Sequence, residues 1–148
     1  CAEIIHHQRL KDDRMKMLTL GQQRFRVLEY VREKPYFVGL VEWIDDEEPT
    51  KDLRHEASEV EQLLRDVVRL SAKLTEQNIE LPQDLPALPK ELSYWVASNL
   101  YRVAPEQQSL LEMHNTAARL EREMEILTST RNHLAARTVL KDTLNQKS

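Results

Sequence analysis

The hydrophobic pattern of this 148-residue chain changes its period near residue 50, and that change constrains the fold more than any other feature. Before it, apolar and β-branched residues form four runs of 7 to 9 residues, at positions 2–10, 14–20, 24–31 and 36–44. The connections between the runs are short and polar, as is typical of antiparallel strands joined by turns. The pattern therefore predicts a meander of four antiparallel strands.

The last of these runs, YFVGLVEWI, is largely apolar on both of its faces. A strand buried on both sides belongs to a small barrel or to a sheet that a second layer covers. Gly21 is expected in a turn that needs a positive φ, whereas Gly39 lies mid-strand, where a strand bends or another segment approaches closely. The β part is therefore predicted to be a partial barrel.

From about residue 52 the pattern becomes helical, with Asp52 as the predicted N-cap. The apolar residues recur at spacings of three, four or seven, so that one face of a helix carries Leu53, Ala57, Val60, Leu64, Val67 and Leu74. The stretch IELPQDLPALP holds three of the six prolines and ends this helix. Pro89 then begins a second helix, whose predicted buried face is Leu92, Trp95, Val96, Leu100 and Val103.

Pro105 begins a short third helix, and Asn115 is the predicted N-cap of a final helix from Thr116 to about Leu144. Because Arg131 interrupts the apolar stripe of this last helix, the helix is predicted to leave the body of the domain near residue 130. The predicted helical core consists of Leu64, Val67, Trp95, Leu100, Leu111, Leu120 and Met124.

These patterns together predict the α+β class. Residues 1–50 are expected to form the β-barrel portion, and residues 51–148 an α-helical bundle with a long C-terminal helix.

The composition argues against several classes of partner. The chain has 21 basic and 25 acidic side chains, and neither residues 1–50 (8 basic, 10 acidic) nor the remainder (13 and 15) forms a basic patch. Nucleic-acid binding through the phosphate backbone is therefore not favoured. Cys1 is the only cysteine, so no internal disulfide is available, which fits a reducing compartment. No apolar run approaches the roughly 20 residues of a membrane-spanning helix.

The polar motifs do not assemble a catalytic, cofactor or metal site. Two glycines are too few for a phosphate-binding G-x-x-x-x-G-K-[ST] loop. His6 and His7 are neighbours on a strand and point to opposite faces, and the run DDEEP at 45–49 is interpreted as a solvated linker. No serine lies in a G-x-S-x-G motif. The chain is therefore predicted to bind no cofactor or metal and not to be an enzyme.

Three aromatic residues are the candidate binding surface. Tyr36, Phe37 and Trp43 lie on one arm of a predicted hairpin, with Phe37 and Trp43 on one face of the strand and Tyr36 on the other. If the layer that covers this strand is incomplete, an apolar patch remains, and such patches bind apolar segments of other proteins.

Two stretches together resemble the Lon protease substrate-binding domain family. GQQRFRVLEYVREKPYFVGLVEW is similar to the β part of that domain, where a strand after a glycine reads R-x-R-[IV]-x-x-[YF]. PEQQSLLEMHNTAARLEREMEIL is similar to its helical end, where K-Q-x-[LV]-L-E is followed by R-L-x-x-[LM]-x-x-[LM]. The matching positions in the second stretch are Gln108, Leu110, Leu111, Glu112, Arg119, Leu120, Glu123 and Ile126 or Leu127.

The resemblance implies a PUA-like β-barrel fused to a helical bundle, and a non-enzymatic module that recognises client proteins for proteolysis or quality control. The alternative is a PUA-like RNA-binding module, because such barrels often bind RNA. The first stretch is especially similar to stand-alone Lon-domain proteins of cyanobacteria and plant plastids, which implies the cytoplasm or the plastid stroma.

Family members carry an apolar strand and a helix before the part that matches here. The resemblance therefore implies that the sequence is truncated at its N-terminus and that its barrel is incomplete. An incomplete barrel would be closed by a retained segment, by strand exchange in a homo-oligomer, or by a strand from a partner protein.

Overall fold

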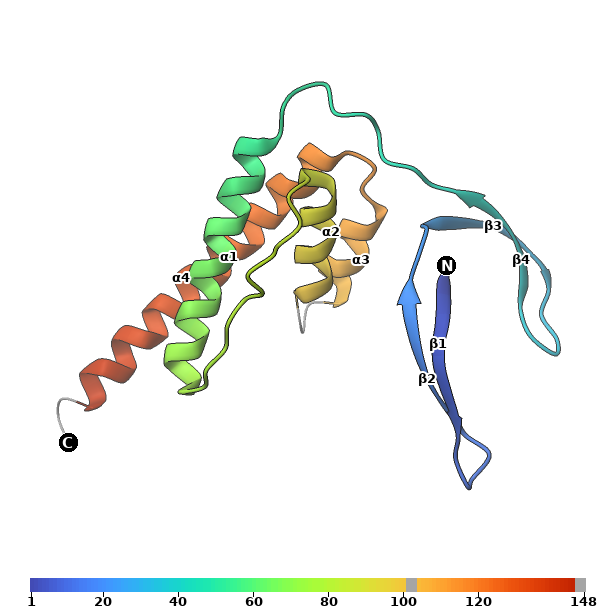
Figure 1. Cartoon of the computed structure of the whole chain (residues 1–148), viewed down its shortest axis with the longest axis horizontal. Coiled ribbons are helices and arrows are strands. Elements are labelled where there is room, and N and C mark those ends of the chain that lie inside the picture. The colour runs from blue at the N-terminus through green and yellow to red at the C-terminus, as the bar shows by residue number, and fades with distance from the viewer. Residues whose placement is uncertain (101–103, 146–148) are drawn as a thin grey trace. The chain divides into compact units, whose positions relative to one another are not determined.

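The computed structural model describes residues 1–100 and 104–145 and confirms the α+β class, with four strands followed by four helices (Figure 1). The chain divides into two compact units, Cys1–Asp45 and Asp46–Ser148. The first unit contains all four strands and the second all four helices.

The β unit consists of two separate antiparallel hairpins, β1 (Ala2–Arg9) with β2 (Met15–Gly21) and β3 (Phe25–Arg32) with β4 (Val38–Trp43). The prediction of one four-stranded meander is therefore wrong, because β2 and β3 are not paired. The two ends of the connection between β2 and β3 are hydrogen-bonded within different hairpins. The Gln22 N–H donates to the Cys1 carbonyl at 2.9 Å in the first hairpin, whereas the Arg24 carbonyl accepts from the Ile44 N–H at 3.1 Å in the second.

Both hairpins contain residues that have no partner on the opposite strand. The register places Ile5 as an extra residue in β1, and Leu28 and Val31 as extra residues in β3. Such bulges change which face the following side chains occupy. No glycine has a positive φ, so the prediction for Gly21 is wrong, and in the turn between β1 and β2 it is Asp13, with φ 62°, that takes the left-handed conformation.

The helical unit contains α1 (Arg54–Thr75), α2 (Pro89–Asn99), α3 (Ala104–Glu112) and α4 (Thr116–Asn145). The predicted start of α2 at Pro89 is confirmed, as is the Asn115 cap, whose Oδ1 accepts from the Ala118 N–H at 3.1 Å. The Asp52 cap is wrong by one residue: Leu53 is the N-cap of α1, and the Asp52 carboxylate accepts from the Arg54 N–H at 3.0 Å.

The core of this unit lies where α1, α2, α3 and α4 meet. Of the predicted members, Leu64, Leu100 and Leu120 are buried, and Val67, Trp95 and Met124 are partly buried. Val103, predicted on the buried face of the second helix, lies outside the described residues. Val60, Val96, Leu110 and Leu127 complete the most buried part of the core.

Helix α4 packs along α1 in the same direction, so that the C-terminal ends of the two helices lie close together (Figure 1). Thr138 is buried, the Lys73 ammonium pairs with the Asp142 carboxylate at 2.7 Å, and the Lys141 ammonium donates to the Leu74 carbonyl at 3.2 Å. The prediction that this helix departs near residue 130 is therefore wrong. Polar contacts replace the apolar stripe there, and an apolar pattern does not reveal them.

The predicted core position at Leu111 is also wrong, because its neighbour occupies that position. The Leu110 side chain is 0% exposed, whereas Leu111 is 46% exposed. Leu110→Ala is therefore expected to lower the free energy of unfolding by about 3 kcal/mol, as large-to-small core substitutions do. Urea unfolding followed by circular dichroism measures this loss. Leu111→Ala is the matched control, and equal losses in the two variants would contradict the assignment of the buried face of α3.

Candidate functional site

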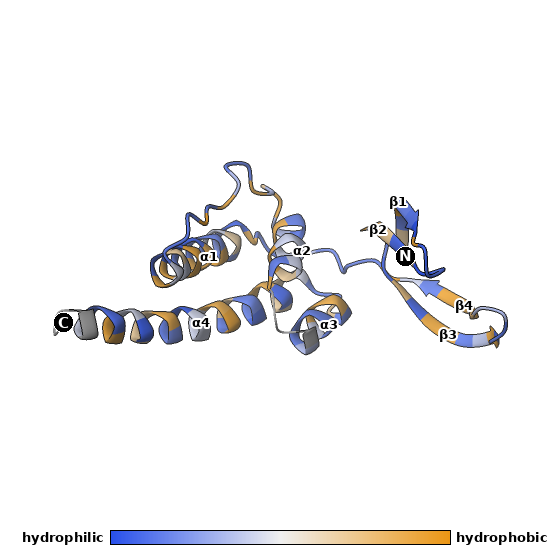
Figure 2. Ribbon diagram, turned by 90° about the horizontal axis from the view of Figure 1, so that it is seen from below, coloured by the Kyte–Doolittle hydropathy of each residue, from blue (hydrophilic) through white to orange (hydrophobic). Residues whose placement is uncertain are grey.

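The β3–β4 hairpin and its turn hold five of the eight aromatic residues in the sequence, and all five are exposed. Hydrophobic residues occur along both strands of this hairpin (Figure 2). Phe37 is 70%, Tyr30 60% and Trp43 54% exposed. Exposed apolar side chains gathered on one element are typical of interaction surfaces.

The register of the hairpin explains how these side chains come to share one face. Residues directly opposite each other on antiparallel strands project from the same side of the sheet. Phe25 lies opposite Trp43, Val27 opposite Val41 and Tyr30 opposite Gly39. Strict alternation would place Tyr30 on the face opposite to Phe25 and Val27. The extra residue Leu28 shifts Tyr30 by one position and so brings it onto the same face.

The contacts between side chains agree with the register. The rings of Phe25 and Trp43 meet edge to face with centroids 6.1 Å apart, and those of Tyr30 and Phe37 lie 5.4 Å apart. A Cβ added at Gly39 would lie 3.3 Å from the Val27 Cγ1 and 3.2 Å from the Glu29 carbonyl, so the predicted close approach at this glycine is confirmed. We call this surface the aromatic face: Phe25, Val27, Tyr30, Phe37, Val41 and Trp43.

The opposite face of the hairpin is mixed: it carries the charged side chains of Arg26, Glu29, Arg32 and Glu42 together with Val38 and Leu40. The Arg26 guanidinium lies 3.7 Å from the Glu42 carboxylate across the two strands. The Arg32 guanidinium lies 4.8 Å from the ring centroid of Tyr36. Of the three candidate residues, Phe37 and Trp43 therefore belong to opposite ends of the aromatic face, whereas Tyr36 packs against an arginine. Sequence reasoning missed Phe25, Val27 and Tyr30; Tyr30 joins the other two only through the bulge at Leu28, which no pattern in the sequence indicates.

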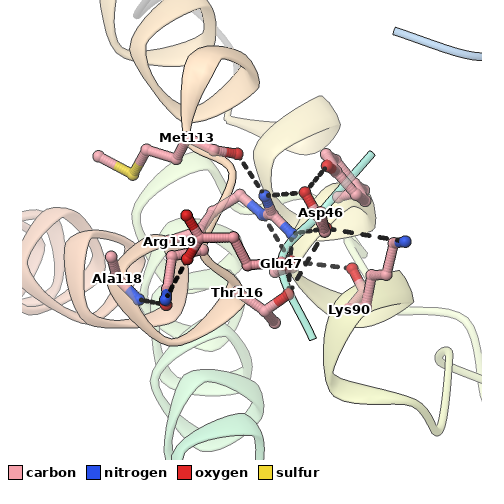
Figure 3. Close-up of polar contacts among 10 residues, drawn as sticks. Asp46, Glu47, Lys90, Met113, Thr116, Ala118 and Arg119 are labelled. Carbon is pink, nitrogen blue, oxygen red and sulfur yellow. Dashed lines mark hydrogen bonds and ion pairs between the residues drawn. The ribbon is translucent and has the colours of Figure 1, made fainter. Parts of the chain in front are cut away.

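The helical unit contains a buried charge cluster around Arg119, which lies between several acceptors (Figure 3). Its guanidinium donates to the Asp46 carboxylate at 2.8 Å, to the Ser93 hydroxyl at 2.8 Å and to the Met113 carbonyl at 2.9 Å. It also lies 3.9 Å from the ring centroid of Tyr94, whose hydroxyl donates to Asp46 at 2.8 Å. The side chains of Arg119 and Asp46 are 0% and 2% exposed.

This cluster corrects the interpretation of DDEEP as a solvated linker. Asp45, Glu47 and Glu48 are exposed, but the Asp46 side chain is buried. The next residue is also fixed: the Glu47 N–H donates to the His114 carbonyl at 2.9 Å, and its carboxylate accepts from the Asn115 amide at 3.0 Å. The first residues of the helical unit are thus bound to the beginning of α4.

A second buried acid, Glu123, lies one turn further along α4. It is 0% exposed, and neither carboxyl oxygen has a hydrogen-bond partner among the described residues. Burial raises the pKa of Glu123 from an ordinary value of 4.5 to about 9, although the nearby Arg119 charge acts in the opposite direction. The side chain is therefore protonated and neutral at pH 7.

A pocket of about 420 Å³ opens beside the Asp46 carboxylate, between residues 46–54, residues 88–90 and Thr116. Several of its charged side chains are paired with each other or with neighbours, as in Lys51 with Glu56 and Asp52 with Arg54. The described part of the chain contains no group of three His, Cys, Asp or Glu side chains that could hold a metal ion. Among the same residues, no helix has the length and apolar character needed to cross a membrane.

Comparisons with known proteins agree on one family. The model of the ATP-dependent protease La (LON) substrate-binding domain matches residues 1–129. Similar curated proteins include the Lon protease of Anaeromyxobacter dehalogenans (28% identical over 135 residues, 90% of this chain) and Lon protease 2 of Myxococcus xanthus (28% over 135 residues, 90%). The Lon protease of Brevibacillus choshinensis is 29% identical over 140 residues. The chain spans 16% to 17% of the length of these relatives.

Proposed function

Because the chain belongs to the ATP-dependent protease La (LON) substrate-binding domain family, we propose that it is a non-enzymatic protein-recognition module that binds client polypeptides through the aromatic face. The observation that carries this proposal is the register of β3 and β4, which gathers five of the hairpin's aromatic and aliphatic side chains with Phe37 on one side, whereas all four charged residues of the paired strands project from the other. Tyr36, whose ring lies against the Arg32 guanidinium, is not part of the proposed binding face.

The chemistry of the face favours an apolar polypeptide as its ligand. Aromatic side chains bury large apolar areas at little cost in conformational entropy, and they dominate the energetics of many protein interfaces. Residues 1–45 contain 8 basic and 7 acidic side chains, a balance that gives a phosphate backbone little to bind. A protein client is therefore preferred to RNA.

The experiment compares two double variants for binding to a permanently unfolded model protein, reduced and carboxymethylated α-lactalbumin. Phe37→Ser with Trp43→Ser removes both ends of the aromatic face and is expected to weaken binding at least about tenfold, because two desolvated aromatic contacts are lost. Fluorescence anisotropy of the labelled model protein measures the affinity. Helical content is followed by circular dichroism and is expected to stay unchanged.

The matched control is Val139→Ser with Leu140→Ser on α4, where both side chains are 64% exposed but belong to the other unit. This control is expected to bind with unchanged affinity. An unaltered affinity of the Phe37 and Trp43 variant, or an equal loss in both variants, would contradict the proposed surface. The native mass of the unbound chain is measured first. Among the described residues each hairpin is a separate two-stranded sheet, so its outer edges are unpaired. The backbone N–H and C=O groups along these edges are open to pairing with a second copy of the chain.

A further inference from the structure

One face of the β1–β2 hairpin carries two methionines and a histidine. In the register of the two strands, His7 lies directly opposite Met17, and Arg9 lies directly opposite Met15. Residues opposite each other on antiparallel strands project from the same side of the sheet, as do residues two positions apart on one strand. The register is regular beyond the bulge at Ile5, so His7, Met15 and Met17 share one face. All three residues are exposed.

The spacing of these three positions suits a single bound ion. In a regular ladder, the Cβ atoms of directly opposite residues such as His7 and Met17 are about 4.5–5.5 Å apart. Met15 is two positions from Met17 and diagonal to His7, and both of these separations are about 7 Å. A thioether sulfur lies two bonds beyond its Cβ on a flexible, unbranched side chain. Two sulfurs and one ring nitrogen can therefore reach a common point above the sheet.

The chemistry of this set selects a soft cation. Thioether sulfur is a soft ligand that suits Cu(I), and imidazole also binds copper, whereas Zn²⁺ and Ca²⁺ sites are built from thiolates, imidazoles, carboxylates and carbonyl oxygens. Glu3, the one acidic residue of the two strands, lies opposite Leu20 and belongs to the other face. Arg9 would repel a cation, but its guanidinium donates to the Asp13 carboxylate at 2.8 Å, which offsets its charge.

We propose that His7, Met15 and Met17 form a surface site for Cu(I). The sequence alone does not reveal this set, because its members come from two strands and only the register aligns them. The neighbouring His6 lies opposite Leu18, on the other face, and takes no part. The proposal runs against the prediction that the chain binds no metal. It is independent of the aromatic face, which belongs to the β3–β4 hairpin.

The first test identifies the ligands in the folded chain. Cys1 is replaced by Ser throughout, because its exposed thiol would itself bind Cu(I). The Cε methyl signals of the four methionines are followed by nuclear magnetic resonance while Cu(I) is added in the absence of oxygen. The signals of Met15 and Met17 and the ring signals of His7 are expected to shift and to saturate at one equivalent. The other two methionines, in the helical unit, are expected to stay unchanged. Unshifted Met15 and Met17 signals would overturn the site.

The second test compares affinities for Cu(I) by competition with the chromophoric chelator bicinchoninate. His7→Gln and Met17→Leu are each expected to weaken binding at least about tenfold, because removing even a group that only supports a metal ligand commonly costs 10- to 100-fold. His6→Gln is the matched control and is expected to bind as the parent does. Zn²⁺ alone, followed by calorimetry, is expected not to bind.

Three results of this comparison would contradict the assignment: equal losses in His7→Gln and His6→Gln, an unchanged affinity in Met17→Leu, or Zn²⁺ binding as tight as that of Cu(I). Circular dichroism checks that each variant keeps its fold. If a variant does not, the methyl shifts of the parent still decide whether the site exists.

Discussion

Arg119→Met is expected to lower the free energy of unfolding by about 3–5 kcal/mol, because it removes the buried cation of the Asp46 carboxylate and leaves only the largely exposed Lys90 ammonium, 4.0 Å away. The side chains of this pair are 0% and 2% exposed, so water cannot replace the lost contact without opening the structure. The same substitution also removes the donors to the Ser93 hydroxyl and the Met113 carbonyl. Urea unfolding followed by far-ultraviolet circular dichroism measures the loss.

Arg122→Met is the matched control, because it changes the same residue type on the same helix. The Arg122 guanidinium pairs with Glu106 and Glu125, but its side chain is 38% exposed, so water screens these contacts and little stability should be lost. A second test combines Arg119→Met with Asp46→Leu, which removes both charges together. This double variant should be more stable than Arg119→Met alone. Similar losses in Arg119→Met and Arg122→Met would show that the buried pair has no special importance.

The sequence predicted the helices more reliably than the contacts that position them. Apolar spacing located α1 and α2, and a single polar residue, Asn115, marked the beginning of α4. The pairing of Asp46 with Arg119 joins residues 73 positions apart, and nothing in an acidic run distinguishes its one buried carboxylate from the three exposed ones. Local patterns report which face of an element is apolar, but a single long-range ion pair leaves no periodic signal.

The same limit applies to the aromatic face. Phe37 and Trp43 could be placed on one face from their spacing alone, because β4 is a regular strand. Tyr30 could not, because its position depends on an extra residue in β3 that reverses the alternation. Likewise, Leu110 and Leu111 are adjacent and equally apolar, so the short helix α3 gives no sequence basis for choosing the buried one.

The second stretch of the sequence resembles the pattern R-L-x-x-[LM]-x-x-[LM], and Glu123 stands at the position where that pattern has leucine or methionine. The structure shows why an apolar residue fits there, since Glu123 is 0% exposed and lies three and four positions along α4 from the buried Leu120 and Leu127. A carboxyl at such a position remains in the core only as the neutral acid, which is what its raised pKa of about 9 describes. The stability of the helical unit should therefore depend on pH through this one group.

The sign of that dependence follows from the two states. Between an unfolded pKa of 4.5 and a folded pKa of about 9, the folded chain holds a proton on Glu123 that the unfolded chain has released. The free energy of unfolding is least affected by Glu123 below pH 4.5, where both states carry the proton. It decreases by about 1.4 kcal/mol per pH unit as the pH rises from 4.5 to about 9. Between about pH 5 and pH 8 the loss is on the order of 4 kcal/mol.

Glu123→Gln removes this titration while keeping the size and polarity of the protonated side chain. The variant and the parent are unfolded with urea at both pH values, and the change in their difference with pH is the quantity of interest. Any fixed cost of burying the amide cancels in that change, as do the contributions of all other titrating groups. The variant is expected to become progressively more stable than the parent toward alkaline pH. Glu125→Gln, an exposed neighbour on the same helix, should follow the parent at both pH values. If the Glu123→Gln difference is independent of pH, the buried carboxyl is ionised in the folded chain and must have a cation or donor beyond those described.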